Sequence, residues 1–154
     1  MLFRLLAKAG CGIDDRHAGA GRSPLQVAAL PFRTDAAGAI EVLLITSRSS
    51  GRWILPKGWP VRGLSLAESA AKEAYEEAGV RGEADEAEIG RLALRGGDGA
   101  RRTLAVFPLR VTDLLDDWPE RRQRRRRWMA PAEAAETVAL GALAPILAGF
   151  SPPS

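Results

Sequence analysis

The sequence is poor in cysteine and histidine and lacks long apolar runs, which argues against disulfides, a zinc site and a membrane span. Its 154 residues include one cysteine, Cys11, and one histidine, His17. A single cysteine forms no intramolecular disulfide and lacks a partner for a Cys/His zinc site, and we assign no role to His17. No stretch reaches the roughly 18 uninterrupted apolar residues of a membrane span, and Arg4 and Lys8 break the opening apolar segment. We therefore expect a soluble, cytoplasmic protein.

A large excess of either charge is also missing, but the charges are unevenly distributed. Lys and Arg number 22 against 19 Asp and Glu, which gives a net charge of +3. Acidic residues concentrate between positions 68 and 88, whereas six arginines lie between Arg121 and Arg127. This asymmetry predicts one segment suited to cations and another suited to anions. With 46% hydrophobic and 27% charged residues, the chain is typical of one globular domain with a core.

Apolar runs separated by turn residues predict a sheet whose strands both precede and follow one helix along the sequence. We expect a loosely ordered lead-in over residues 1–23, a domain over 24–150 and a tail over 151–154. Strand-like segments are predicted at 25–32, 41–48, 53–55, 88–95 and 102–111. The first two are expected to pair with each other, and the last two are expected to be joined by the glycine-rich turn GGDGA.

The C-terminal third predicts a loop, a short strand and two helices. Residues 118–129 contain the arginines and end in Trp128 and Met129. We expect Trp128 to anchor the strand to the final helices. Pro131 opens a helix, and Pro145 is expected to split or kink the last one. Trp59 and Trp118 fall in predicted loops, where an indole either packs or stacks on a base.

The helix between the two groups of strands can be located from its ends. Ser65 and Glu68 have the spacing of a capping box, in which each side chain satisfies a free backbone N–H. Gly79 is typical of the left-handed residue that ends a helix. Small side chains recur at helical spacing and predict a face that packs closely on a sheet, at Ala67, Ala70, Ala71, Ala74 and Ala78.

Three glutamates of this helix lie close together. Glu73, Glu76 and Glu77 are spaced i, i+3 and i+4, so their carboxylates repel at a cost on the order of 0.2–0.5 kcal/mol per pair. A divalent cation would remove the repulsion, and oxygen ligands favour Mg²⁺ or Mn²⁺. A solvated acidic face explains the three residues equally simply.

The surrounding residues favour the metal site, because the segment resembles the Nudix box, G-x5-E-x7-R-E-U-x-E-E-x-G-U with U apolar. The matches are in register at Gly58, Glu73, Ala74, Glu76, Glu77, Gly79 and Val80. Leu64 stands where the box has its first glutamate, which braces the loop in the family. Lys72 stands where the box has arginine and loses the bidentate fork that arginine offers a carboxylate.

The resemblance implies a Nudix α/β/α sandwich, with a mixed sheet between helices, that hydrolyses a phosphoanhydride. Glu73, Glu76, Glu77 and the carbonyl of Gly58 would bind Mg²⁺ or Mn²⁺, and Lys72 would orient a glutamate. The ion would lower the pKa of a bound water that attacks one phosphorus. The general base is either a box glutamate or Glu120.

The basic residues suggest a densely phosphorylated small molecule as substrate. Lys57 and Arg62 either contact its phosphates or are solvated loop charges. Arg124 and Arg126 are further candidates, unless the arginine run only protects a sheet edge. The phrase LPKGW with a basic C-terminal half is similar to the branch that hydrolyses diphosphoinositol polyphosphates and diadenosine polyphosphates.

The alternative is a non-catalytic Nudix-fold module whose arginines bind RNA or another polyanion. Leu64 and Lys72 favour that alternative, and the three retained glutamates oppose it. The sequence does not distinguish a monomer from a homodimer.

Overall fold

The computed structural model describes residues 23–154. The predicted lead-in therefore lies outside the described residues except for Ser23, as do Cys11 and His17. None of the helices within residues 23–154 is long and apolar enough to cross a membrane.

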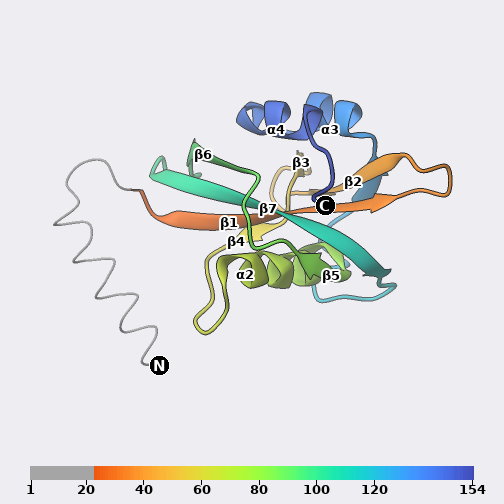
Figure 1. The fold of residues 1–154 in the computed structure, drawn as a ribbon. Helices are drawn as coiled ribbons and strands as arrows, with labels where there is room; N and C mark the ends of the chain where they lie inside the picture. Colours follow the sequence, from red (N-terminus) through yellow and green to blue (C-terminus); the bar gives the residue numbers. More distant parts are fainter. Residues whose placement is uncertain (1–22) are drawn as a thin grey trace.

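A mixed sheet lies between two layers of helix, which confirms the predicted α/β/α sandwich (Figure 1). One face is covered by α2 (Leu66–Glu73), which continues as a π-helical turn, η2 (Ala74–Ala78). The other face is covered by α3 (Pro131–Thr137), the 3-10 turn η3 (Gly141–Leu143) and α4 (Ala144–Ala148). Pro131 lies at the start of α3 as predicted, and Pro145 stands at the start of α4, where its missing N–H costs no helical hydrogen bond.

The strands follow the predicted runs closely. They are β1 (Leu25–Thr34), β2 (Ile40–Thr46), β3 (Trp53–Ile54), β4 (Lys57–Gly58), β5 (Val80–Ala84), β6 (Gly90–Arg95), β7 (Arg101–Leu114) and β8 (Arg126–Met129). The main path is β3-β2-β1-β7-β5, with β4 paired to β1, β6 to β7 and β8 to β2. Only β1 and β7 run parallel among these pairs, and β1 pairs with β2 and β6 with β7 as predicted.

Alternation along β1 separates two cores. Ala28, Leu30 and Phe32 pack on the side of α3 and α4, whereas Val27 and Ala29 pack on the side of α2. The alanine stripe meets the second core as predicted, because Ala67, Ala70, Ala74 and Ala78 are fully or almost fully buried. Small side chains bring the backbone of α2 close to the sheet, which fixes the position of the glutamates that follow.

The structure corrects the sequence analysis at three places. Neither β4 nor β5 has a counterpart among the predicted strands, and in β5 the reason is that Arg81, Gly82 and Glu83 lack a strand-like composition. Gly82 nevertheless pairs with Val111 on β7, and a Cβ at Gly82 would overlap the Arg110 carbonyl. Trp128 does not anchor β8 to the final helices, since it packs in the core on the α2 side. Its neighbour Met129 faces α3 and α4 instead.

Candidate functional site

The site is built where β4 passes the start of the π-helical turn. Ser65 caps α2 with both hydrogen bonds of the predicted capping box, and Gly79 ends η2 with φ of +66°. Gly58 lies directly against the Glu73 carboxyl group, and any Cβ at position 58 would overlap it. The absence of a side chain at Gly58 therefore allows the Glu73 carboxylate to lie against the β4 backbone.

Glu77 is the most enclosed of the three glutamates. The residue is 8% exposed. Its Oε1 accepts a hydrogen bond from the Lys57 backbone N–H at 3.2 Å, and its Oε2 pairs with Arg124 Nη2 at 3.3 Å. These two donors favour the charged form of the carboxylate and so offset part of the cost of its burial.

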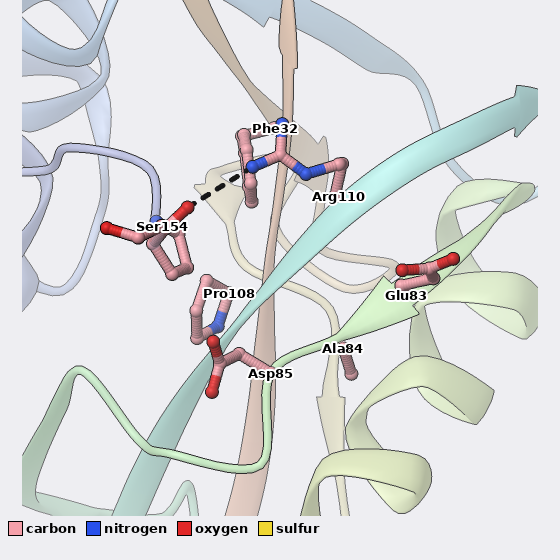
Figure 2. Close-up of a pocket in the computed structure, with 8 residues that line it drawn as sticks. Phe32, Glu83, Ala84, Asp85, Pro108, Arg110 and Ser154 are labelled. Carbon is pink, nitrogen blue, oxygen red and sulfur yellow. Dashed lines mark hydrogen bonds between the residues drawn. The ribbon is translucent and has the colours of Figure 1, made fainter.

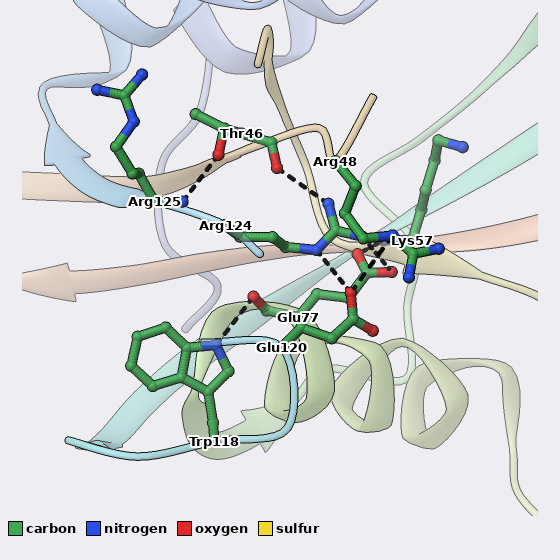
Figure 3. Close-up of polar contacts among 8 residues, drawn as sticks. All are labelled: Thr46, Arg48, Lys57, Glu77, Trp118, Glu120, Arg124 and Arg125. Carbon is green, nitrogen blue, oxygen red and sulfur yellow. Dashed lines mark hydrogen bonds and ion pairs between the residues drawn. The ribbon is translucent and has the colours of Figure 1, made fainter. Parts of the chain in front are cut away.

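Arg124 joins Glu77 to Glu120, as Figure 3 shows. Its Nε donates to Glu120 Oε1 at 2.8 Å, and its Nη1 donates to the Thr46 carbonyl at 3.0 Å. The side chain is only 7% exposed. Glu120 itself is held beside η2 because its backbone N–H donates to the Glu76 carbonyl at 3.1 Å. The structure thus brings Glu120, distant in sequence, to the three box glutamates.

Lys72 lies where the resemblance requires a cation that orients a glutamate. Its Nζ donates to Glu76 Oε2 at 2.7 Å, one helical turn away. This hydrogen bond raises the pKa of Lys72, so the ammonium group is charged at neutral pH. A lysine provides one point of contact rather than the two of an arginine fork.

Crowding of carboxylates shows most clearly at Glu73. Burial, followed by repulsion from Glu77 and Glu76, raises the pKa of Glu73 to about 7. Burial also raises the pKa of Glu77, against the opposing charge of Arg124. These neighbouring carboxylates therefore repel one another, and an added positive charge between them would be favourable.

The oxygen-only donor set has the chemistry that Mg²⁺ or Mn²⁺ prefers. In residues 23–154, no three carboxylate, imidazole or thiol groups already converge as a closed metal cage. Instead Glu77 is turned to Arg124, Glu76 to Lys72 and Glu73 to Gly58. The residues fit a divalent ion in kind, and binding would require the glutamates to exchange Arg124 and Lys72 for the ion as partners.

Arg126 lies at the end of η2. Its Nη1 donates to the carbonyls of Ala78 and Gly79, its Nη2 donates to the Leu115 carbonyl, and its guanidinium lies 4.0 Å from the centre of the Trp118 ring. A cation here satisfies carbonyls at the negative end of a helix, which is a structural role. Trp118 packs in the same place, donating to the Glu77 carbonyl at 3.2 Å.

Three other cations border the site. Lys57 extends away from Glu77 and Glu120 in Figure 3, on the opposite side of β4 from Glu73. Arg62 lies in the loop between β4 and α2. Arg48 was missed by the sequence analysis: it follows β2, its side chain is 61% exposed, and its Nε lies 3.9 Å from Glu120. The only sequence signal for Arg48 is its place just after the end of a buried strand.

The loop that carries Leu64 is braced without the missing glutamate. Leu64 is 39% exposed, and its N–H donates to the Val61 carbonyl at 3.1 Å. The fully buried Ser69 accepts a hydrogen bond from the Val61 N–H at 2.9 Å. These contacts tie the loop to the first turn of α2.

A hollow on the face of the sheet opposite α2 is lined in part by the C-terminal residues Pro153 and Ser154 (Figure 2). Arg110 stacks over Phe32 and donates to the Pro153 carbonyl at 3.3 Å. Glu83 and Asp85 lie on its rim. Since the only arginine of this hollow already holds the C-terminal segment, the acidic cluster on α2 is the better candidate site.

Known proteins with similar sequences cover most of the described domain. The chain is 35% identical to diphosphoinositol polyphosphate phosphohydrolase 2 of Rattus norvegicus over 118 residues, which is 73% of this chain and 62% of that protein. It is 35% identical to the mitochondrial Nudix hydrolase 12 of Arabidopsis thaliana, over 66% of this chain and 54% of that protein. The chain thus spans little more than half the length of such plant relatives.

A solved structure has the same fold. An Ap4A hydrolase of C. elegans in a binary complex superposes with a TM-score of 0.65, at 21% identity, over 82% of this chain and 99% of that one. The family model of the NUDIX domain matches residues 24–150, which include the acidic cluster and both helical layers. With its box in register and its fold shared, the chain belongs to the Nudix family of hydrolases.

Proposed function

We propose that the chain is a Mg²⁺-dependent pyrophosphohydrolase that cleaves a phosphoanhydride bond in a densely phosphorylated small molecule. The observation that carries the proposal is the set of carboxylates at the junction of β4 and η2, in which Glu73 has a pKa of about 7. Such crowding is unfavourable in the absence of a cation. A relative that is a diphosphoinositol polyphosphate phosphohydrolase and a structural neighbour that hydrolyses Ap4A support a polyphosphorylated substrate.

The side chains would divide the work as follows. Glu73, Glu76, Glu77 and the Gly58 carbonyl would hold the ion, and Lys72 fixes Glu76. A divalent ion held by these residues would supply Lewis-acid chemistry at the phosphoanhydride. In the hydrolysis, a water oxygen would bond to one phosphorus while the bridging P–O bond breaks, and the second phosphate would leave with the bonding electrons. We expect Lys57, Arg62 and Arg48 to contact the substrate phosphates.

The general base is best sought among the box glutamates. The Arg124 guanidinium contacts Glu120 at 2.8 Å and Glu77 at 3.3 Å, so Glu120 helps to hold the arginine against Glu77. The pKa of Glu73 is raised to about 7, a value that suits a base at physiological pH. We therefore assign Glu120 to positioning, through Arg124, and a box glutamate to proton transfer.

The test measures phosphate release with and without Mg²⁺ from diphosphoinositol polyphosphates, diadenosine polyphosphates, nucleoside triphosphates and sugar nucleotides. Glu77→Gln should lower metal-dependent turnover by on the order of 100-fold or more, because it removes a charged ligand. Glu133→Gln, which changes a surface glutamate paired with Arg127 on α3, is the matched control and should keep full activity. Absence of Mg²⁺-dependent turnover on the whole panel would refute the proposal.

A further inference from the structure

Helix α2 has a buried hydroxyl group among its alanines. Ser69 is fully buried, as is its neighbour Ala70. A serine inside a helix is less favourable than an alanine, because its hydroxyl competes for backbone hydrogen bonds. A buried hydroxyl also loses its contacts with water and needs a partner in the protein. The group that Ser69 contacts therefore indicates what this hydroxyl does.

That group is a backbone N–H in the loop between β4 and α2. The Ser69 Oγ accepts a hydrogen bond from the Val61 N–H at 2.9 Å. The Val61 carbonyl in turn accepts from the Leu64 N–H at 3.1 Å, which closes a turn that contains Gly63 with φ of +84°. Ser69 therefore ties the turn over residues 61–64 to the first half of α2.

Ser69 lies one helical turn before Glu73 on the same side of α2. The two residues are spaced i and i+4, so their side chains share one face and lie about 6 Å apart along the helix axis. The Glu73 carboxyl group lies against Gly58, and the Ser69 hydroxyl binds Val61. Residues 58–61 therefore run along this face of α2 and contact it at both ends. Release of Val61 would leave the backbone at Gly58 held only from the side of β4, which pairs with β1.

The side chain of Leu64 provides no such hold on the loop. It is apolar, and the residue is 39% exposed. A leucine accepts no hydrogen bond, whereas the glutamate at this place in the box would offer two carboxylate oxygens. The Val61 N–H instead has its acceptor on the helix, at Ser69.

We propose that Ser69 is a positioning residue for the metal site, which takes the place of the missing first glutamate of the box and sets the affinity for the divalent ion. Ser69 holds Val61, and Val61 keeps Gly58 against Glu73. Ser69 would touch neither the ion nor the substrate, so its loss should weaken ion binding and leave the rate at saturating Mg²⁺ close to that of the parent. This inference rests on the proposed function, since it concerns the same metal site.

The experiment measures Mn²⁺ binding to the full chain, without substrate, by calorimetric titration at one fixed pH. Ser69→Ala removes the acceptor and adds no bulk, and it should weaken Mn²⁺ binding about 2- to 10-fold. Amide exchange at Val61 should become faster, because its N–H loses its partner. The melting temperature without metal should stay close to that of the parent, because the better helix propensity of alanine offsets the lost hydrogen bond.

Two controls separate this role from a general weakening of the fold. Ser47→Ala removes a contact of the same kind, since the Ser47 Oγ accepts from the Ser50 N–H at 3.1 Å in the loop between β2 and β3, and it should leave Mn²⁺ affinity unchanged. Ala71→Gly weakens α2 without removing a side-chain acceptor, so it should lower the melting temperature and change Mn²⁺ affinity less than Ser69→Ala does. Unchanged Mn²⁺ affinity in Ser69→Ala, or an equal loss of affinity in Ala71→Gly, would overturn the assignment.

The hydrolysis assay distinguishes this role from catalysis itself. Ser69→Ala should raise the KM for Mg²⁺ with kcat close to that of the parent, and a lower kcat with an unchanged KM would contradict a positioning role. Weaker Mn²⁺ binding in Ser69→Ala, in a chain that hydrolyses no substrate of the panel, would refute the proposed function and leave the role of Ser69 standing. Absence of Mn²⁺ binding by the parent would refute both.

Discussion

At the scale of single residues, the carboxyl group of Glu73 is the clearest case of a group whose charged form is unfavourable at this site. Its neighbours Glu76 and Glu77 are fixed by Lys72 and Arg124, whereas Glu73 lies against Gly58, which has no side chain. Burial and the two neighbouring charges therefore act on Glu73 with little compensation. Functional sites often carry such destabilising groups, which a ligand then relieves.

The pKa of Glu73 predicts how stability depends on pH. The ordinary pKa is 4.5 and the folded value is about 7, so the folded state binds more protons between these values. Stability should fall as pH rises from about 4.5 to 7, and Glu73→Gln should remove the part of this fall that Glu73 causes. At pH 8 without metal, the free energy of unfolding of the variant should be about 1–2 kcal/mol higher than that of the parent. This range allows for solvent screening of a partly exposed group.

Thermal melts across this pH range, in the presence of a chelator, measure the effect. The difference between Glu73→Gln and the parent should vanish near pH 4.5, and added Mg²⁺ should stabilise the parent more than the variant. Glu133→Gln is the control, since Glu133 pairs with Arg127 at an exposed position. A Glu73→Gln variant that is less stable than the parent at pH 8 would contradict this account.

At the scale of elements, the π-helical turn and its end decide where the glutamates point. A π-turn is a local departure from the α-helix that often occurs at functional sites, and here it includes Glu76 and Glu77. Gly79 closes it in the left-handed conformation, with Trp118 packed directly against its Cα and Arg126 donating to its carbonyl. The end of η2 is therefore fixed by the segment 115–126.

Two glycines with the same conformation allow this packing to be tested. Gly79 and Gly51 have φ of +66° and +68°, but a Cβ at Gly79 would overlap Trp118 whereas one at Gly51 meets no atom within 4 Å. Gly51→Ala should cost about 1–2 kcal/mol for the left-handed conformation alone. Gly79→Ala should cost a further 1–3 kcal/mol, roughly, for overpacking, and it should also lower turnover because η2 shifts.

Denaturant unfolding of both variants provides the comparison, and the rate of hydrolysis provides the second measurement. Equal losses of stability would mean that Trp118 moves away easily. In that case the segment 115–126 would not hold the end of η2, and the turnover of Gly79→Ala should match that of Gly51→Ala.

At the scale of the whole molecule, the arginine run offers less to a polyanion than its sequence suggests. Arg124 and Arg126 are turned inward, and Arg127 pairs with Glu133. The remaining three lie exposed, at Arg121, Arg122 and Arg125. A non-catalytic module that grips RNA through this run therefore has about half of the expected contacts.

Salt dependence of RNA binding tests this count. Three arginines that contact a single strand should give a slope of about −2 in a plot of log affinity against log salt concentration, because each neutralised phosphate contributes about 0.7. Binding should be weak at physiological salt and unchanged in Glu77→Gln. A slope steeper than about −4 with tight binding at physiological salt would support the binding module over the enzyme.

The local features of this protein were determined by the sequence itself. The capping box at Ser65, the end of the helix at Gly79, the alanine stripe and the spacing of the glutamates all follow from residues a few positions apart. The alternating runs also predicted most strands and, with the box, the sandwich fold. Each of these features depends on near neighbours in the chain, whose geometry secondary structure alone sets.

Only the tertiary structure decided which side chains meet across the sheet. Arg124 donates to the carbonyl of Thr46, 78 positions away in the chain, and it forms ion pairs with Glu77 and Glu120 instead of facing solvent. Trp128 lies on the side of α2, and Trp59 reaches Arg102 above Gln26. Such contacts are set by strand order and register, which no short stretch of sequence specifies, because they come from burying many distant side chains at once.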